Sequence, residues 1–110
     1  MIGIIGAMEE EVEQIVAAME VTREETKASM TFKAGKLSGK DAVIVVSGIG
    51  KVNAGICTQI LVDDFNVDCV INTGIAGSLN ASIDIGDIVI SSDVLHHDVD
   101  ATSFGYPVGQ

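Results

Sequence analysis

Three short apolar segments each run into a glycine-rich turn, and this pairing constrains the fold more than any other feature. Residues 1–5 end at Gly6, residues 42–46 at the SGIGK turn, and residues 67–72 at the NTGIAGS turn. Apolar runs of this length, bounded by glycine, are typical of buried strands. Because open α/β sheets bind ligands beyond the carboxyl ends of their strands, we expect a site where these turns meet.

Two segments with helical periodicity follow the first and second turns. The first places Met8, Val12, Ile15, Val16 and Met19 on one face. The second places Val52, Ile56, Cys57, Ile60 and Leu61 on one face. Asp63 and Asp64 lie near the end of the second helix, where they oppose the helix dipole, so we expect solvent or a basic partner beside them.

The remaining segments predict further strands and a long loop. Residues 21–28 are polar and predict a connection or an edge strand, and residues 30–37 alternate as one arm of a hairpin that feeds residues 42–46. Residues 87–91, DIVIS, predict another buried strand, and residues 92–110 predict a functional loop. Five or six strands and two helices predict an α/β fold that needs more chain or a partner to cover its sheet.

The composition excludes several classes of protein. The 110 residues carry 16 acidic and 6 basic side chains, a net charge of −10, which disfavours nucleic-acid and anionic-membrane binding. No apolar run approaches the ~20 residues that span a bilayer, and the start lacks the basic region of a signal peptide. Cys57 and Cys69 are interpreted as two buried, reduced thiols, so we expect a cytoplasmic protein.

Three glutamates open the first predicted helix. For Glu9 and Glu10 the favoured interpretation is stabilisation by the helix dipole and solvation. Glu11 immediately precedes the core position Val12, so its side chain could lean toward the strand edge. A carboxyl group held among apolar groups there would have a raised pKa and could act as a general acid or base.

Three other motifs give weaker indications of a catalytic or binding site. The SGIGK turn is not a P-loop, and the dinucleotide fingerprint G-x-G-x-x-G does not occur. The HHDVD stretch at 96–100 has no further ligand elsewhere that would complete a metal site, so we interpret it as a hydrogen-bonded loop. Phe104, Tyr106 and Pro107 form an aromatic tip of the kind that packs on a subunit or a flat ligand.

Five blocks of sequence together resemble the bacterial 5′-methylthioadenosine/S-adenosylhomocysteine nucleosidases, of the purine nucleoside phosphorylase-like superfamily. The blocks are IGIIGAMEEEV at 2–12, SGIGKVNA at 47–54, INTGIAGSL at 71–79, GDIVIS at 86–91 and HHDVDATSFGYPVGQ at 96–110. The resemblance implies a mixed central sheet flanked by helices in a three-layer fold, usually assembled as a homodimer. Residues 1–110 would be the N-terminal half of a single nucleosidase domain.

The resemblance also implies an activity: hydrolysis of the N-glycosidic bond of methylthioadenosine and adenosylhomocysteine, releasing adenine and a thioribose. It implies a small thio-nucleoside substrate and no metal or organic cofactor. The family protonates the leaving adenine and holds the ribose hydroxyls with acidic residues of the C-terminal half. We therefore expect a second chain or segment to carry that half, and residues 1–110 alone to be inactive.

Site residues follow from the resemblance position by position. Glu11 matches the glutamate that activates the attacking water. The implied pocket residues are Met8 and Ile49 around the ribose and 5′-thio group, Gly74, Ala76 and Gly77 beside the nucleoside, Ala101 near the base or thioalkyl tail, and Phe104 reaching into the neighbouring subunit's 5′-alkylthio pocket. Many relatives carry serine where this chain has Ile75, so one hydrogen-bond donor near the ribose is lost here.

Three alternatives remain open at this point. A nucleoside phosphorylase would need a basic phosphate site, for which six Lys and Arg residues give little material. A futalosine-type nucleosidase shares the same motifs. A fragment that dimerises or binds nucleosides without cleaving them would also fit, because the later acids are missing.

Overall fold

The structure, a computed structural model, describes all residues 1–110, which divide into two compact units, residues 1–77 and 78–110. The first unit is an α/β sheet unit. Its elements are β1 (Ile2–Gly6), the 3₁₀ turn η1 (Glu9–Glu11), α1 (Glu13–Ala17), β2 (Met19–Lys27), β3 (Met30–Leu37), β4 (Lys40–Val46), α2 (Lys51–Phe65) and β5 (Cys69–Asn72).

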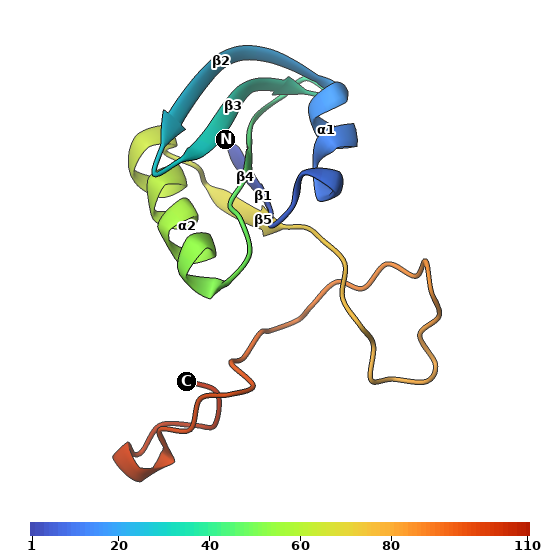
Figure 1. The fold of residues 1–110 in the computed structure, drawn as a ribbon, viewed down its shortest axis with the longest axis vertical. Helices are drawn as coiled ribbons and strands as arrows, with labels where there is room; N and C mark the ends of the chain where they lie inside the picture. Colours follow the sequence, from blue (N-terminus) through green and yellow to red (C-terminus); the bar gives the residue numbers. More distant parts are fainter. The chain divides into compact units, whose positions relative to one another are not determined.

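The sheet is mixed, with strand order β2-β3-β4-β1-β5. β1 pairs in parallel with both β4 and β5, so that Ile4 faces Ile44 on one side and Ile71 on the other. β2, β3 and β4 form an antiparallel meander. In Figure 1, α1 and α2 lie on opposite sides of this sheet. The predicted mixed sheet flanked by helices is therefore confirmed, as is the predicted hairpin.

Successive side chains of the central strands point to opposite faces of the sheet, and a hydrophobic core forms on each face. On the α2 side, Leu61 and Cys57 pack against a cluster that includes Phe32, Val43 and Val45. On the α1 side, the buried residues are Ile4, Val12, Met19, Ala42 and Ile44. Successive residues of β4 thus enter opposite cores, which explains why that strand is apolar throughout.

Both helices differ from their predicted extent or face. The first is interrupted at Val12, whose ψ of −13° and φ of −124° separate η1 from the short α1, and Met19 already belongs to β2. In α2 the buried face is Cys57, Leu61 and Phe65, spaced by four residues. Val52 is 76% exposed, because only the stripe directed at the sheet finds cover.

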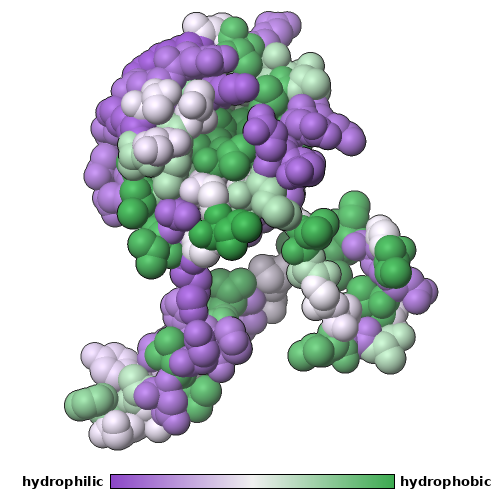
Figure 2. Space-filling view, viewed as in Figure 1, coloured by the Kyte–Doolittle hydropathy of each residue, from purple (hydrophilic) through white to green (hydrophobic).

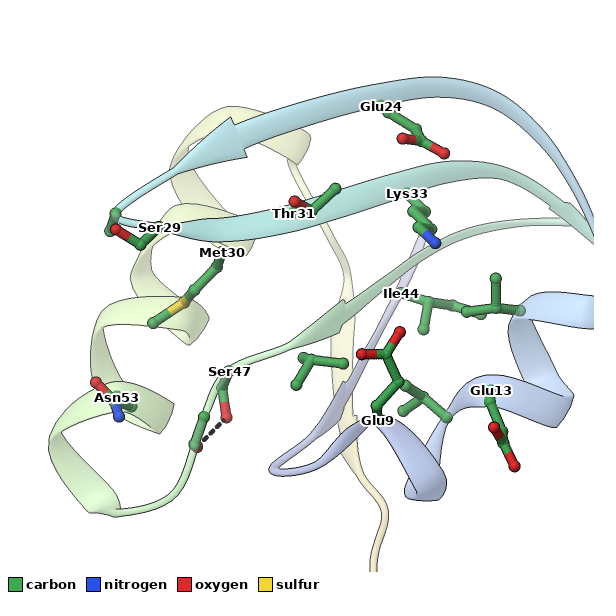
Figure 3. A pocket seen from close by; sticks show the side chains of 15 residues that line it. Glu9, Glu13, Glu24, Ser29, Met30, Thr31, Lys33, Ile44, Ser47 and Asn53 are labelled. Atoms are coloured by element: carbon green, nitrogen blue, oxygen red, sulfur yellow. Dashed lines mark hydrogen bonds between the residues drawn. The ribbon is translucent and has the colours of Figure 1, made fainter.

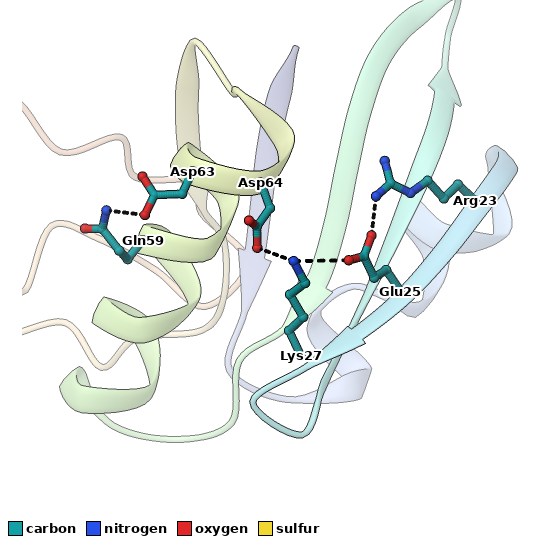
Figure 4. Close-up of polar contacts among 6 residues, drawn as sticks. All are labelled: Arg23, Glu25, Lys27, Gln59, Asp63 and Asp64. Atoms are coloured by element: carbon teal, nitrogen blue, oxygen red, sulfur yellow. Dashed lines mark hydrogen bonds and ion pairs between the residues drawn. The ribbon is translucent and has the colours of Figure 1, made fainter.

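At the acidic end of α2, Asp64 has a basic partner, one of the two surroundings that were expected. Lys27 Nζ lies 2.7 Å from Asp64 Oδ2 and 3.2 Å from Glu25 Oε1, and so joins edge strand β2 to the helix (Figure 4). Asp63 instead accepts a hydrogen bond of 2.9 Å from Gln59 Nε2. The polar segment that precedes β3 is thus an edge strand, the second of the two predicted possibilities, and an ion pair links it to α2.

The last strand of the first unit departs from expectation. β5 is the outer strand of the sheet and is mostly exposed, so the prediction of a buried strand is wrong. Cys69, on this strand, is exposed, which corrects the prediction of two buried thiols. Cys57 is buried, and desolvation raises the pKa of its thiol to about 11. Strand β5 pairs with β1 alone, and of its side chains only Val70 packs against a core of this unit, so the others remain exposed.

The second unit, residues 78–110, contains turns and a single 3₁₀ turn, η2 (Thr102–Phe104). The strand predicted over 87–91 is absent, because no strand in this unit offers a hydrogen-bonding partner. Ile88 and Ile90 are each 90% exposed, and Figure 2 shows such apolar side chains at the surface. The long loop predicted from residue 92 is confirmed. No helix in either unit is long and apolar enough to cross a bilayer.

Candidate functional site

The carboxyl ends of the three parallel strands meet at one edge of the sheet, as the sequence predicts. The Ser47 N–H, just past β4, donates a 2.9 Å hydrogen bond to the carbonyl oxygen of Gly6. The Thr73 N–H, just past β5, donates a 2.9 Å hydrogen bond to the carbonyl oxygen of Ile5. Both following loops are therefore held against the end of β1.

The turn after β1 brings Glu11 to this edge. A Cβ on Gly6 would lie 2.6 Å from Val12 Cγ1, so the tight turn requires glycine. Glu11 is the last residue of η1, and its Oε2 accepts hydrogen bonds from the N–H groups of Ala7 (2.7 Å) and Met8 (3.1 Å). Reaching back to the residue before the helix is the usual behaviour of an acidic capping residue.

A second contact distinguishes Glu11 from an ordinary capping residue. Its other oxygen, Oε1, accepts a 3.2 Å hydrogen bond from the N–H of Ile75, which lies 64 residues further along the chain. The carboxylate therefore joins the turn after β1 to the loop after β5. Glu9 and Glu10, its neighbours, show no comparable hydrogen bond and remain exposed, as the solvation interpretation predicts.

The pKa of Glu11 moves in the opposite direction from the sequence-based expectation. Hydrogen bonds from the N–H groups of Met8, Ile75 and Ala7 hold this pKa below its usual value, and desolvation opposes them without reversing the shift. The expected raised pKa is therefore wrong, because the carboxylate faces backbone donors rather than apolar side chains. Glu11 is ionised at neutral pH.

This geometry defines what the carboxylate can do. A carboxylate offers about four lone-pair positions, of which Oε2 uses two and Oε1 uses one. The remaining acceptor position of Oε1 is free to orient a water molecule and to take its proton. A fixed negative charge of this kind can also stabilise positive charge that develops beside it.

The carboxylate borders a shallow hollow of about 400 Å³. Its lining residues are Met8, Glu10, Glu11, Thr73, Gly74 and Ile75. Four of the residues singled out by sequence thus meet in one place: Met8, Glu11, Gly74 and Ile75. The Ile75 side chain is exposed beside the carboxylate.

The other sequence-predicted residues do not line this hollow. Ile49 is exposed on the loop between β4 and α2, and Ala76 and Gly77 are exposed just past the hollow. Ala101 and Phe104 belong to the second unit, where Ala101 is half-buried before η2 and Phe104 is 83% exposed. The predicted aromatic tip is thus exposed.

The HHDVD loop is internally bonded, as predicted. Asp100 Oδ1 accepts hydrogen bonds from the Thr102 N–H (3.0 Å) and hydroxyl (2.6 Å), which hold the pKa of Asp100 below its usual value. His97 Nδ1 lies 3.7 Å from Asp98 Oδ1. No group of three or more His, Cys, Asp or Glu residues in the described chain could hold a metal ion.

Sequence reasoning missed the contributions of Ala7, Glu10 and Thr73. Ala7 and Thr73 act through backbone N–H groups, and a backbone donor has no side-chain signature. Glu10, the second residue of η1, lines the hollow while its side chain remains exposed. Their place in the sequence was the available signal: Ala7 and Glu10 follow Gly6 at the end of β1, and Thr73 lies between β5 and Gly74.

A larger cleft of about 720 Å³ lies elsewhere on the first unit (Figure 3). Glu9 and Glu13 line one side, and Met30, Ser47 and Asn53 line the other. Ile44 lies between these two groups in Figure 3, and Val46 also lines the cleft. We assign the functional site to the smaller hollow, because only there does a carboxylate held by fixed donors lie at the meeting point of the strand ends.

Comparison with known proteins shows the family to which this chain belongs. A family model described as the Phosphorylase superfamily matches residues 1–110. A protein from Shewanella oneidensis, named 5′-methylthioadenosine/S-adenosylhomocysteine nucleosidase, is 58% identical over 99% of this chain, which covers 46% of that relative. The chain therefore spans about half the length of the curated relatives it matches.

Solved structures give the same likeness. A nucleosidase of that name from Colwellia psychrerythraea, in complex with adenine, has a TM-score of 0.94 and 53% identity, and this chain covers 45% of it. One from Neisseria meningitidis, in complex with methylthio-immucillin-A, has a TM-score of 0.93 and 45% identity, with 47% of it covered. A futalosine hydrolase from Helicobacter pylori has a TM-score of 0.87 and 34% identity, again with 47% covered.

Proposed function

The chain belongs to the phosphorylase superfamily, and from this premise we propose that it forms the N-terminal half of a nucleosidase domain. The domain hydrolyses the N-glycosidic bond of 5′-methylthioadenosine and S-adenosylhomocysteine, and releases adenine and a thioribose. Support comes from the names of the relatives and from the adenine and methylthio-immucillin-A complexes of the neighbours. The greater likeness to these nucleosidases favours them over the futalosine hydrolase.

The observation that carries this proposal is the Glu11 carboxylate. It is ionised and accepts hydrogen bonds from three backbone N–H groups. It lines the hollow and retains one free acceptor position. Glycosidic cleavage passes through a transition state with positive charge on the sugar and requires a water nucleophile at its anomeric carbon. A single fixed carboxylate beside the sugar serves both needs.

In the proposed reaction, the C–N bond to adenine lengthens while positive charge builds on the ribose beside Glu11. Oε1 accepts a proton from water as the water oxygen bonds to the anomeric carbon. Because its pKa is lowered, Glu11 is a modest base, and its larger contribution is the fixed negative charge. The departing adenine must gain a proton, and no group lining the hollow other than Glu10 and Glu11 can titrate.

We therefore propose that the acid for adenine, and the residue that holds the ribose hydroxyls, come from the other half of the domain, as a second chain or segment. Met8 and Ile75 would contact the ribose and the 5′-thio group. A homodimer, in which Phe104 of one subunit contacts the substrate of the other, is part of the same proposal. So are a cytoplasmic location and a role in methionine salvage.

The test combines this chain with a separately purified fragment of the Shewanella oneidensis relative, comprising the part that this chain does not match. Adenine release from methylthioadenosine is followed by chromatography, without phosphate. We expect release from the mixture, and a loss of roughly 10²–10⁴-fold with Glu11→Gln, the usual range for general base catalysis. Glu13→Gln, an exposed residue of α1 outside the hollow, is the matched control.

The alternatives give different results in the same assay. Turnover that depends on added phosphate would identify a phosphorylase. Cleavage of futalosine with no cleavage of methylthioadenosine would identify the futalosine class. Binding of methylthioadenosine by the mixture without adenine release, in wild type and Glu11→Gln alike, would overturn the catalytic proposal.

A further inference from the structure

We propose that Gly74 is a positioning residue: its lack of a side chain lets the loop after β5 lie directly against the Glu11 carboxylate, so that the Ile75 N–H fixes Oε1. The meaning of this arrangement for catalysis rests on the proposed function. The arrangement itself is a property of the first unit and can be tested without any turnover.

The distances show how little space exists at this position. A Cβ built on Gly74 would lie 2.6 Å from Glu11 Oε1, 3.0 Å from its Cδ and 3.3 Å from Oε2. All three nearest atoms therefore belong to one carboxylate. At Gly77, three residues further along the same loop, an added Cβ would meet nothing within 4 Å.

Backbone conformation does not explain this glycine. Gly39, Gly48 and Gly50 in the first unit have positive φ angles, which favour glycine for steric reasons, but Gly74 does not. An alanine at Gly74 could adopt the same backbone conformation. Glycine is needed here for the space beside Glu11 alone.

The loop cannot simply move away to admit a side chain. Its first residue, Thr73, donates a 2.9 Å hydrogen bond from its backbone N–H to the Ile5 carbonyl oxygen, which holds the loop at the position next to Gly74. The nearest atoms are the far end of a flexible glutamate side chain, which can rotate at little cost to the fold. Gly74→Ala should therefore fold normally but displace the carboxylate, which separates a positioning role from a structural one.

The displaced carboxylate would lose the Ile75 donor, one of the hydrogen bonds that keep the pKa of Glu11 low. The N–H groups of Ala7 and Met8 belong to the same turn as Glu11 and bind its other oxygen, Oε2, whereas the Ile75 N–H binds Oε1, the atom nearest to the added Cβ. Glu10 is the other titratable group that lines the hollow, so its titration must be resolved from that of Glu11.

The experiment is an NMR titration of the 110-residue chain, with the side-chain carboxyl carbons of Glu10 and Glu11 and the Ile75 amide followed as the pH falls. In the wild type we expect the Ile75 amide to titrate together with Glu11. In Gly74→Ala we expect the pKa of Glu11 to rise toward its usual value and the Ile75 amide to stop titrating. Gly55→Ala, on the open side of α2, is the matched control and should leave both unchanged.

A Gly74→Ala chain that retains the wild-type pKa of Glu11 and the titrating Ile75 amide would overturn the proposal. If Gly74→Ala does not fold, Glu11→Gln gives an independent result: the Ile75 amide must lose its pH dependence, and an amide that still titrates would refute the contact. Neither readout needs substrate, so failure of the proposed activity leaves this test decisive.

The catalytic consequence is measured in the two-fragment adenine-release assay. Gly74→Ala should lower kcat more than it raises KM, because the carboxylate is misplaced rather than removed. The acidic limb of the pH profile should also move to higher pH, following the pKa of Glu11. A variant with an unchanged profile and unchanged kcat would refute the positioning role.

Discussion

The two units of this chain have similarly apolar sequences but bury them very differently. In the sheet unit, Phe32, Val43 and Leu61 are completely buried. In residues 78–110, Leu79 and Ile85 are as exposed as in an extended chain. The difference is that the sheet unit supplies its own partners, with β1 between two parallel neighbours and a helix on each face.

Hydrophobicity alone therefore does not determine burial in this chain. The DIVIS stretch at 87–91 is as strand-like as residues 42–46, which form a central strand. A strand exists only when neighbouring backbone groups accept and donate its hydrogen bonds. Large exposed apolar patches are typical of protein–protein or ligand-binding surfaces.

The largest expected difference between the units is the response to the same leucine truncation. Leu61→Ala should destabilise the sheet unit by about 2–5 kcal/mol, because it opens a cavity in the core beneath α2. Leu79→Ala, in the exposed unit, should change the free energy of unfolding by less than about 0.5 kcal/mol. Urea unfolding followed by circular dichroism measures both. Equal losses would show that Leu79 is buried in solution.

A second comparison tests how closely the backbone of the sheet unit is packed. A Cβ on Gly35 would lie 2.0 Å from the Glu20 carbonyl oxygen, at the bulge where β2 shifts register between Val21 and Arg23. Gly35→Ala should cost about 1–3 kcal/mol, since backbone atoms must move. Gly55→Ala, in open space on α2, should instead stabilise by up to about 1 kcal/mol. A neutral Gly35→Ala would show that the bulge relaxes freely.

The sequence predicted most of the sheet unit because its local signals agree with its tertiary contacts. The glycine turns, the alternation at 30–37 and the apolar residues 42–46 correspond to real elements. The first helix was overestimated: Met8 fits helical spacing but precedes η1 and belongs to neither core, and Met19 packs in the core from strand β2. Periodicity records which residues are buried, not which element buries them.

The location of the candidate site could be predicted from the sequence, but its electrostatics could not. The glycines located the strand ends, and the resemblance pointed to Glu11. Nothing in the sequence showed that the Ile75 N–H would meet the carboxylate across 64 residues. The direction of the pKa shift depends on that contact and on the N–H groups of Ala7 and Met8, so it could not be predicted from residue types.

A third comparison sets Glu11 against Asp100, two carboxylates with lowered pKa in different units. Glu11 joins distant segments, whereas Asp100 bonds only within its own loop, to Thr102. Glu11→Gln should therefore lower the Tm of the sheet unit at pH 7, and Asp100→Asn should not. The stabilisation by Glu11 is complete above the unfolded-state pKa of about 4.3 and disappears as the pH falls through the lower folded-state value.

Thermal melts of both variants from pH 7 to pH 3 measure this effect. The difference in Tm between wild type and Glu11→Gln should stay constant down to about pH 5 and then shrink. A difference that grows on acidification would contradict the lowered pKa of Glu11. An equal loss in Asp100→Asn would show that the two units are energetically coupled.

The smallest effect is expected from the charged link between α2 and edge strand β2. Lys27 pairs with Asp64 and Glu25, and Arg23 also pairs with Glu25 (Figure 4), but all four side chains keep 27–59% of their surface exposed to solvent. Lys27→Met should lower the Tm slightly at low salt, and the difference should vanish near 1 M salt, where the screening length is about 3 Å. Lys40→Met is the control, because Lys40 lies on β4 and forms no ion pair. A loss that persists at high salt would mean that Lys27 acts through the packing of its alkyl chain, and that the edge of the sheet unit is held by burial rather than by charge.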